Sequence, residues 1–163
     1  MPSYEIEPEG SGSPFLACPR CQHQISLRVE GLTWHVRSPR DVTDRLLAQL
    51  GHLEREELHV LTLTTKNAVM DARCIYKGNV SASLVRTGEL FREAVARHAA
   101  GIILVHNHPS GDPTPSPQDL HLTAEVIAAG RLLDIAVLDH VILGNGEYVS
   151  LRDRGVQFDR HTA

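Results

Sequence analysis

Residues 101–119, GIILVHNHPSGDPTPSPQD, begin with a wholly apolar run that leads directly into two histidines two positions apart. A short apolar run bounded by a glycine and by polar residues is typical of a strand buried within a sheet. Side chains two positions apart on a strand point to the same face. We therefore expect a buried strand over residues 101–105, with His106 and His108 directed to one side at its end.

The same stretch ends in the pattern of a helix start. Ser116 suits the N-cap, Pro117 the first helical position and Asp119 the third. The positive end of the helix dipole stabilises an ionised carboxylate at that point. Prolines at positions 109, 113, 115 and 117 stiffen the intervening loop, which lowers the entropy cost of folding it back toward the histidines.

His106, His108 and Asp119 together form a donor set for a divalent metal. Two imidazole nitrogens and one carboxylate oxygen are ligands that Zn²⁺ commonly takes, and three protein ligands leave a fourth position for water. Each part has a plainer explanation by itself, because a His-x-His pair is weak evidence and Asp119 and Ser116 could serve only as a helix cap. The combination favours a catalytic metal site over a closed structural one.

The flanking patterns predict a mixed α/β domain with helices packed on a sheet. Ser38, Pro39 and Gly51 have the residue types that begin and end a helix. A second helix should begin with Thr87 as N-cap and turn Val95, among others, toward the core. The expected order is helix, strand, strand, helix, strand, helix, strand, strand, from residues 38–51, two strands within 56–78, 87–100, 101–105, 117–133, 136–144 and 147–151.

Four segments are expected along the chain. Residues 1–15 are rich in Gly, Ser, Pro and Glu and predict a flexible tail, and residues 157–163 predict a second tail. Residues 16–37 contain a Cys-x-x-Cys followed by alternating apolar residues, which indicates a small knuckle with a β-hairpin, packed by Trp34. Residues 38–156 form the main domain.

The Cys-x-x-Cys at Cys18 and Cys21 leaves three interpretations open: a structural zinc site, a redox pair, or no special role. A structural zinc site needs four ligands, and these cysteines supply two. Cys74, the third cysteine of the chain, falls in a predicted core strand and is expected to be an inert buried thiol. His23 and His35 could complete the site, or two chains could share one.

Composition limits the class of protein. The 163 residues carry a formal net charge of −4, and the densest basic segments, residues 37–45 and 152–160, are interleaved with acids, so nucleic-acid binding through phosphate contacts is not favoured. No apolar run approaches the roughly 20 residues that span a bilayer. The N-terminus lacks the pattern of a secretory signal, and three cysteines do not form a disulfide framework. We expect a cytoplasmic protein, with its oligomeric state open.

The spacing His-x-His, seven residues, Ser, two residues, Asp resembles the JAMM (MPN-plus) metalloprotease motif. The surrounding segments AAGIILVHNHPSGDPTPSPQD and LDHVILGNGEYVSL resemble more closely the RadC-like branch of JAB-domain proteins. The similarity covers roughly residues 38–155. It implies the JAMM fold, a cytidine-deaminase-like mixed sheet flanked by helices, together with a zinc ion and hydrolysis of a peptide or isopeptide bond. Asp139 and His140 resemble a family pair, for which we expect a structural, hydrogen-bonded role.

The resemblance also implies a glutamate general base at the start of an upstream strand, where this chain has Glu56 and Glu57. The family pattern aligns with Glu56. Adjacent residues of a strand face opposite sides, so only one of the two can face the metal, and Glu57 is then expected to be a solvated surface acid. Ser116 resembles the family serine, whose hydroxyl stabilises the oxyanion of the tetrahedral intermediate.

The expected partner is a protein or peptide substrate, for which a ubiquitin-like conjugate is one option. Two other functions stay open at this stage: an accessory protein of DNA repair that associates with nucleic acid, and a JAB-fold protein-interaction scaffold without activity. A basic stripe would favour the first, and loss of metal ligands would favour the second. The sequence does not name the substrate.

Overall fold

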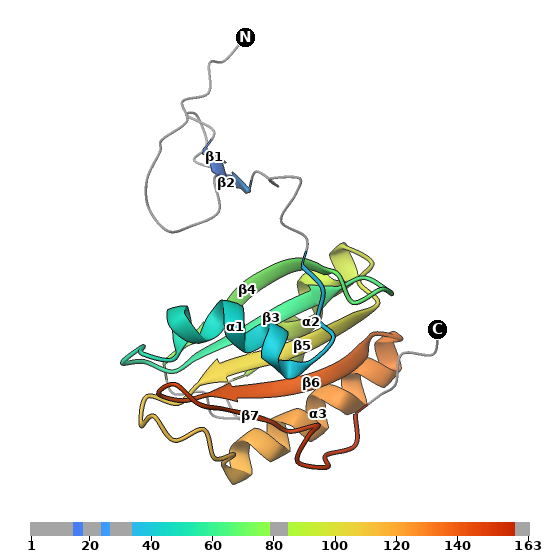
Figure 1. Cartoon of the computed structure of the whole chain (residues 1–163). Helices are drawn as coiled ribbons and strands as arrows, with labels where there is room; N and C mark the ends of the chain where they lie inside the picture. Colours follow the sequence, from blue (N-terminus) through green and yellow to red (C-terminus); the bar gives the residue numbers. More distant parts are fainter. Residues whose placement is uncertain (1–14, 18–23, 27–33, 79–84, 159–163) are drawn as a thin grey trace. The chain divides into compact units, whose positions relative to one another are not determined.

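A computed structural model describes residues 15–17, 24–26, 34–78 and 85–158 (Figure 1). The chain divides into two units, residues 1–33 and 34–163. In the first unit, β1 (Phe15–Ala17) pairs antiparallel with β2 (Gln24–Ser26). The predictions for Cys18, Cys21, His23 and most of both tails lie outside the described residues.

The second unit has the predicted order of elements and is a mixed α/β domain. Its elements are α1 (Pro39–Leu50), β3 (Glu57–Leu63), β4 (Val69–Lys77), α2 (Thr87–Ala96), β5 (Gly101–Asn107), α3 (Pro117–Leu133), β6 (Ala136–Leu143) and β7 (Tyr148–Ser150). The sheet order is β4-β3-β5-β6-β7. Only β5 and β6 are parallel among these pairs, as expected for two strands joined through a helix, here α3.

Helices cover both faces of this sheet (Figure 1). Leu58 and Val60 of β3 belong to a core cluster with apolar residues of α2 and α3. Leu61 and Leu63 belong to a second cluster, with apolar residues of α1. Because β3 and β5 are covered on both sides, their sequences contain runs of apolar residues without strict alternation.

The ends of α1 and α3 follow the capping residues in the sequence. Each helix has serine at its N-cap, Ser38 or Ser116, and proline directly after it. The third helical residue, Asp41 or Asp119, turns its carboxylate back to the backbone N–H of the cap. Such reciprocal capping bonds satisfy donors that the first helical turn leaves unpaired.

Two details of the prediction for α2 are wrong. The N-cap of α2 is Arg86, one residue before Thr87. The buried face of α2 is formed by Leu90, Phe91 and Ala94. Val95 lies outside this face, near the end of the helix, and is 51% exposed.

Trp34 belongs to the second unit, and its predicted packing on the N-terminal hairpin stays a prediction. Its carbonyl accepts a hydrogen bond from Val69 N–H at 2.8 Å, so its segment runs along the start of β4. Its ring packs against the α1 cluster, with the Arg45 guanidinium 5.1 Å from the ring centroid. This long-range backbone pairing is not visible in local sequence patterns.

Candidate metal centre

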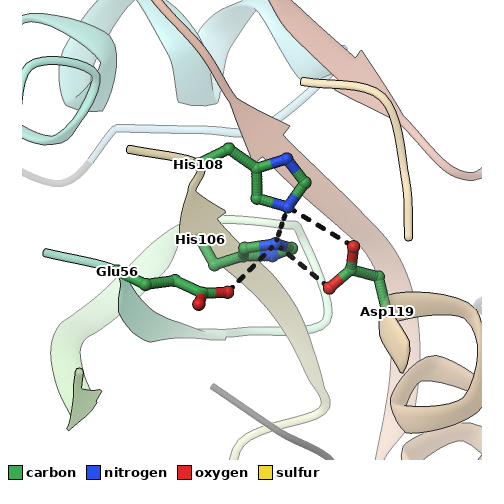
Figure 2. A group of neighbouring side chains, drawn as sticks. All are labelled: Glu56, His106, His108 and Asp119. Atoms are coloured by element: carbon green, nitrogen blue, oxygen red, sulfur yellow. Dashed lines mark hydrogen bonds and ion pairs between the residues drawn. The ribbon is translucent and has the colours of Figure 1, made fainter. Parts of the chain in front are cut away.

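Four side chains converge at the carboxyl end of β5 (Figure 2). Glu56, His106, His108 and Asp119 each offer one ligand atom, and these atoms all lie within 4.8 Å of one another. The two Nε2 atoms of the histidines are 2.9 Å apart. Asp119 Oδ1 lies 3.2 Å from His106 Nε2, and Asp119 Oδ2 lies 3.4 Å from His108 Nε2. The structure thus brings the three predicted ligands together.

The strand register explains how Glu56 reaches this group. Leu58 of β3 pairs with His106 of the antiparallel β5, so Glu56, two residues earlier, comes level with His108, two residues later. Directly opposed residues of antiparallel strands share a face of the sheet. That face is the one covered by α3, and the first turn of α3 supplies Asp119.

Hydrogen bonds determine which nitrogen of His106 carries its proton. Thr123 Oγ1 donates its proton to the Asp119 carbonyl at 2.6 Å. In its 2.7 Å contact with His140 Nδ1 the same hydroxyl can therefore only accept, so His140 Nδ1 carries a proton. His140 is completely buried, which holds its pKa well below the usual value and keeps the ring neutral. Its Nε2 therefore accepts from His106 Nδ1–H at 2.7 Å. With Nδ1 occupied by this hydrogen bond, Nε2 is the His106 nitrogen that faces the site.

His108 also carries a proton on Nδ1, for a simpler reason. Its Nδ1 lies 2.8 Å from the carbonyl oxygen of Asp112, which can only accept, so Nδ1 carries the proton. The loop that supplies this carbonyl packs against Gly144: a Cβ at that position would collide with the carbonyl oxygen of Gly111. Glycine at 144 therefore permits the close approach that orients His108.

The donor set fits a divalent metal ion. The Nε2 atoms of His106 and His108 lie 2.9 Å apart and both face the Asp119 carboxylate, so the space between the three groups suits a proton or a metal cation. Burial alone would raise the pKa of Asp119, but contacts with His106 and His108 hold it well below the usual range, so the carboxylate is ionised. Ligands ~2.0–2.1 Å from a tetrahedral zinc are ~3.3 Å apart, close to the separations seen here. Hydrogen bonds from ligand histidines to carbonyls and neighbouring side chains are typical of metal sites.

The two glutamates at the start of β3 separate to opposite faces. Glu56 Oε1 lies 3.9 Å from His106 Nε2, beside the proposed ligands. Glu57 instead contacts Lys77 Nζ and His59 Nε2, each at 3.0 Å, and its side chain is only 14% exposed. The expectation that Glu57 is a solvated surface acid is wrong, because β4 covers it with a cross-strand lysine.

Ser116 lies next to Asp119 and orients it. The Ser116 hydroxyl donates to Asp119 Oδ2 at 2.7 Å, and the Ser116 backbone N–H donates to the same oxygen at 2.7 Å. The Asp119 N–H donates back to Ser116 Oγ at 3.2 Å. A role for this hydroxyl in binding an oxyanion requires its proton to turn from Asp119 to the substrate, and that role stays a prediction.

Asn107, between the two ligand histidines, has a structural role that sequence reasoning did not assign. Its side chain is completely buried on the opposite face from His106. Asn107 Oδ1 accepts from Glu57 N–H at 2.8 Å, and Nδ2 donates to the carbonyls of Arg55 at 3.0 Å and Leu53 at 3.4 Å. Asn107 thus holds the backbone on both sides of Glu56. A second polar residue, directly after His106 at the end of an apolar strand, was the available signal.

Asp139 and His140 have the hydrogen-bonded role expected of them, with one addition. Asp139 accepts from Ser150 Oγ at 2.6 Å and from the backbone N–H groups of His140 and Arg152, which joins β6 to β7 and the turn beyond it. His140 also contacts a proposed metal ligand directly, and its partner Thr123 was not identified from the sequence.

Fold and site define a class of protein: an α/β domain with a two-histidine, one-carboxylate group at the end of a central strand. Residues 36–156 match the model of the RadC-like JAB domain, and the chain belongs to this family. It is 52% identical over 124 residues to a UPF0758 protein of Chloroflexus aurantiacus, covering 76% of this chain and 54% of that protein.

Further relatives come from other bacteria. A UPF0758 protein of Roseiflexus castenholzii is 50% identical over 125 residues, covering 77% of this chain and 54% of the relative. A UPF0758 protein of Symbiobacterium thermophilum is 46% identical over 119 residues, covering 73% of this chain and 51% of the relative. The chain spans about half the length of these curated relatives, and their names state no activity. Among the described residues, no helix has the length and apolar character needed to cross a membrane.

Proposed function

We propose that this domain is a zinc-dependent metallopeptidase that hydrolyses a peptide or isopeptide bond. The observation that carries the proposal is the convergence of two imidazole Nε2 atoms and the Asp119 carboxylate, with the Glu56 carboxylate 3.9 Å from one of the imidazoles. Zn²⁺ suits mixed imidazole and carboxylate ligands and, when bound, supplies Lewis acidity that activates a water and polarises a carbonyl.

Glu56 is the proposed general base. Its carboxylate takes a proton from the attacking water and passes it to the leaving amine, a transfer that typically contributes about 10²–10⁴-fold to the rate. Its distance from His106 Nε2 leaves it beside the ligand group. Asn107 holds the backbone before and after Glu56, which keeps the carboxylate at that position during the two proton transfers.

Ser116 has two proposed tasks. In the resting site its hydroxyl orients Asp119, and on substrate binding the same O–H turns to donate to the developing oxyanion. His140 and Thr123 have a positioning role, since they hold His106 in the tautomer that leaves Nε2 free of a proton.

The proposed substrate is a protein or peptide, and a ubiquitin-like conjugate is one form of it. An amide carbonyl polarised at the ligand group, with a base and a hydroxyl donor beside it, is the arrangement that amide hydrolysis requires. The sequence is mildly acidic and its densest basic segments are interleaved with acids, which does not favour a nucleic-acid substrate. A cytoplasmic location stays a prediction from the sequence, and a structural zinc at Cys18 and Cys21 stays one of the three interpretations left open there.

The test is a screen of the wild-type chain and Glu56→Gln against peptide libraries and ubiquitin-like conjugates, with zinc content measured on the same samples. We expect cleavage by the wild type and a loss of at least ~10²-fold in kcat in Glu56→Gln, with zinc retained. Equal cleavage by a zinc-loaded Glu56→Gln protein would exclude Glu56 as the base. Zinc-loaded wild type that cleaves nothing in either set would contradict the peptidase assignment.

A further inference from the structure

The face of β3 opposite the candidate centre carries a second group of ligand-type side chains. Glu57 and His59 on β3 and Cys74 on β4 each offer one ligand atom, and these atoms all lie within 4.8 Å of one another. Glu57 Oε2 and His59 Nε2 are already 3.0 Å apart. We propose that Glu57, His59 and Cys74 form a second zinc site, which fastens the edge strand β4 to β3.

A β-bulge creates this arrangement. His59 pairs with Cys74, whereas the preceding residue, Leu58, pairs with Tyr76, so β4 has one extra residue between the two pairs. The extra residue brings both Cys74 and Lys77 to the face that carries Glu57 and His59. If His59 still paired with Cys74 and β4 lacked the bulge, Tyr76 would pair with Glu57 in place of Lys77. Bulges commonly re-aim side chains in this way near functional sites.

The three donors suit zinc and leave a fourth position for water. Zn²⁺ takes thiolate at ~2.3 Å and imidazole at ~2.0–2.1 Å, so its ligand atoms lie ~3.3–3.6 Å apart. All three side chains are partly exposed and can close the present separations by small rotations. Burial lowers the pKa of His59, which keeps its imidazole neutral and able to coordinate.

Binding exchanges one proton for the metal. Burial and the nearby Glu57 carboxylate raise the pKa of Cys74 to about 11, so the free thiol is protonated, and its Sγ–H points to the Tyr76 carbonyl at 3.3 Å. On coordination the thiol proton leaves to solvent and the thiolate binds zinc. Without metal, His59 Nε2–H donates to Glu57 Oε2 at 3.0 Å. On coordination Nε2 gives this proton to solvent and Nδ1 takes one up, so His59 makes no net release.

Lys77 forms an ion pair with Glu57 and so competes with a metal ion for that carboxylate. Its Nζ lies 3.0 Å from Glu57 Oε1, while its side chain is 65% exposed. Because Lys77 is the solvent-exposed partner, its attraction to Glu57 is weakened by water, and a divalent ion can displace it from the carboxylate. Lys77 is therefore a competitor, and its removal should strengthen metal binding. The site is separate from the proposed peptidase chemistry and does not depend on it.

The test uses the full chain with Cys18→Ser and Cys21→Ser, which leaves Cys74 as the only thiol. Co²⁺ serves as the spectroscopic probe, and a thiolate-to-cobalt charge-transfer absorption reports coordination by Cys74. The candidate centre of His106, His108 and Asp119 contains no sulfur and cannot produce this band. We expect the band to saturate at one Co²⁺ per chain and to disappear when Zn²⁺ is added.

Variants in this background separate the site from simple thiol binding. His59→Ala and Glu57→Gln should each weaken Co²⁺ binding by at least ~10-fold, the loss seen even for indirect partners of a metal. Lys77→Ala should tighten it by up to ~5-fold, the effect of one exposed ion pair. His121→Ala, on the exposed side of α3, is the matched control and should change nothing. Circular dichroism confirms that each variant folds. Absence of the band, or a folded His59→Ala or Glu57→Gln protein with unchanged affinity, would overturn the proposal.

Discussion

The Nδ1 atom of His106 lies 2.7 Å from Nε2 of His140, and both side chains are almost completely buried. His140 is held in turn by Thr123, whose hydroxyl bonds to the carbonyl of Asp119. The chain of contacts therefore begins and ends at two proposed metal ligands. It fixes the protonation of His106 and ties that strand residue to the first turn of α3.

Replacing His140 by Phe should lower zinc affinity by about 10–100-fold although no ligand is removed. His106 Nδ1–H would lose its acceptor in a buried position, and the ring would no longer be held in one tautomer. A competition titration with a chromophoric chelator measures the change. His121→Phe, at an exposed histidine of α3, is the control. Wild-type affinity in His140→Phe would show that His106 needs no such support.

Replacing Asn107 by Leu should reduce both stability and activity while His106 and His108 still bind zinc. The change leaves Glu57 N–H and the carbonyls of Arg55 and Leu53 without their partner, and each buried unsatisfied group costs about 1–3 kcal/mol. Without these hydrogen bonds the backbone around Glu56 is held less firmly, so the substitution should lower kcat by a larger factor than it lowers zinc content.

Urea unfolding and kinetics on the same samples check this prediction. Thr62→Val is a suitable control, because the Thr62 hydroxyl is buried in β3 without a hydrogen-bond partner among the described residues. Its loss should leave stability equal or higher. An Asn107→Leu protein with wild-type kcat would contradict the positioning role.

Two substitutions at Ser116 separate its capping from its proposed catalytic task. Asn caps helices about as well as Ser, whereas Ala does not, so Ser116→Ala should lose about 1 kcal/mol of stability and Ser116→Asn should lose little. Both lack the hydroxyl, and both should lower kcat, by up to ~10²–10³-fold if the hydroxyl binds the oxyanion. Thermal unfolding and kcat measure the two effects. Wild-type kcat in Ser116→Asn would reduce Ser116 to a helix cap.

Asp41 should make stability depend on pH in the acid range. Hydrogen bonds from the backbone N–H groups of Arg37 and Ser38, each 2.8 Å, lower the pKa of its carboxyl. A lowered pKa contributes stability that is fully present above the unfolded value of about 3.9 and is lost as pH falls through the folded value. Asp41→Asn should therefore be less stable than wild type near neutrality, by less than about 1 kcal/mol for this partly exposed group, and the gap should close below about pH 4. A gap independent of pH, in urea unfolding at several pH values, would contradict this origin.

Local patterns in the sequence predicted most of the fold. Apolar runs and the capping residues around Pro39 and Pro117 depend on neighbours along the chain, and the order of elements follows from them. The same local rules indicated which ligands would meet: strand alternation for His106 and His108, and a helix cap for Asp119. Their catalytic or metal-binding roles stay predictions.

What the sequence did not reveal depends on contacts between distant segments. Asn107 contacts residues 50–54 positions away, and His140 lies 34 positions from His106, so neither partner is visible in a local window. The pairing of Trp34 with Val69 has the same origin. Glu57 became a paired, mostly buried acid because a bulge in β4 set Lys77 opposite it, and single-sequence periodicity does not detect bulges.

The most direct test of the central claim is the zinc content of a chain with Cys18, Cys21 and Cys74 all changed to Ser, compared with the same protein carrying His106→Ala. Removing the three thiols excludes the cysteine-based sites, so any tightly held zinc must use other ligands. Elemental analysis after dialysis against zinc and then buffer should give close to one zinc per chain, and essentially none with His106→Ala. His121→Ala should retain the metal. A folded cysteine-free protein that holds no zinc, or a His106→Ala variant that holds as much as its parent, would contradict the assignment of His106, His108 and Asp119 as a metal site.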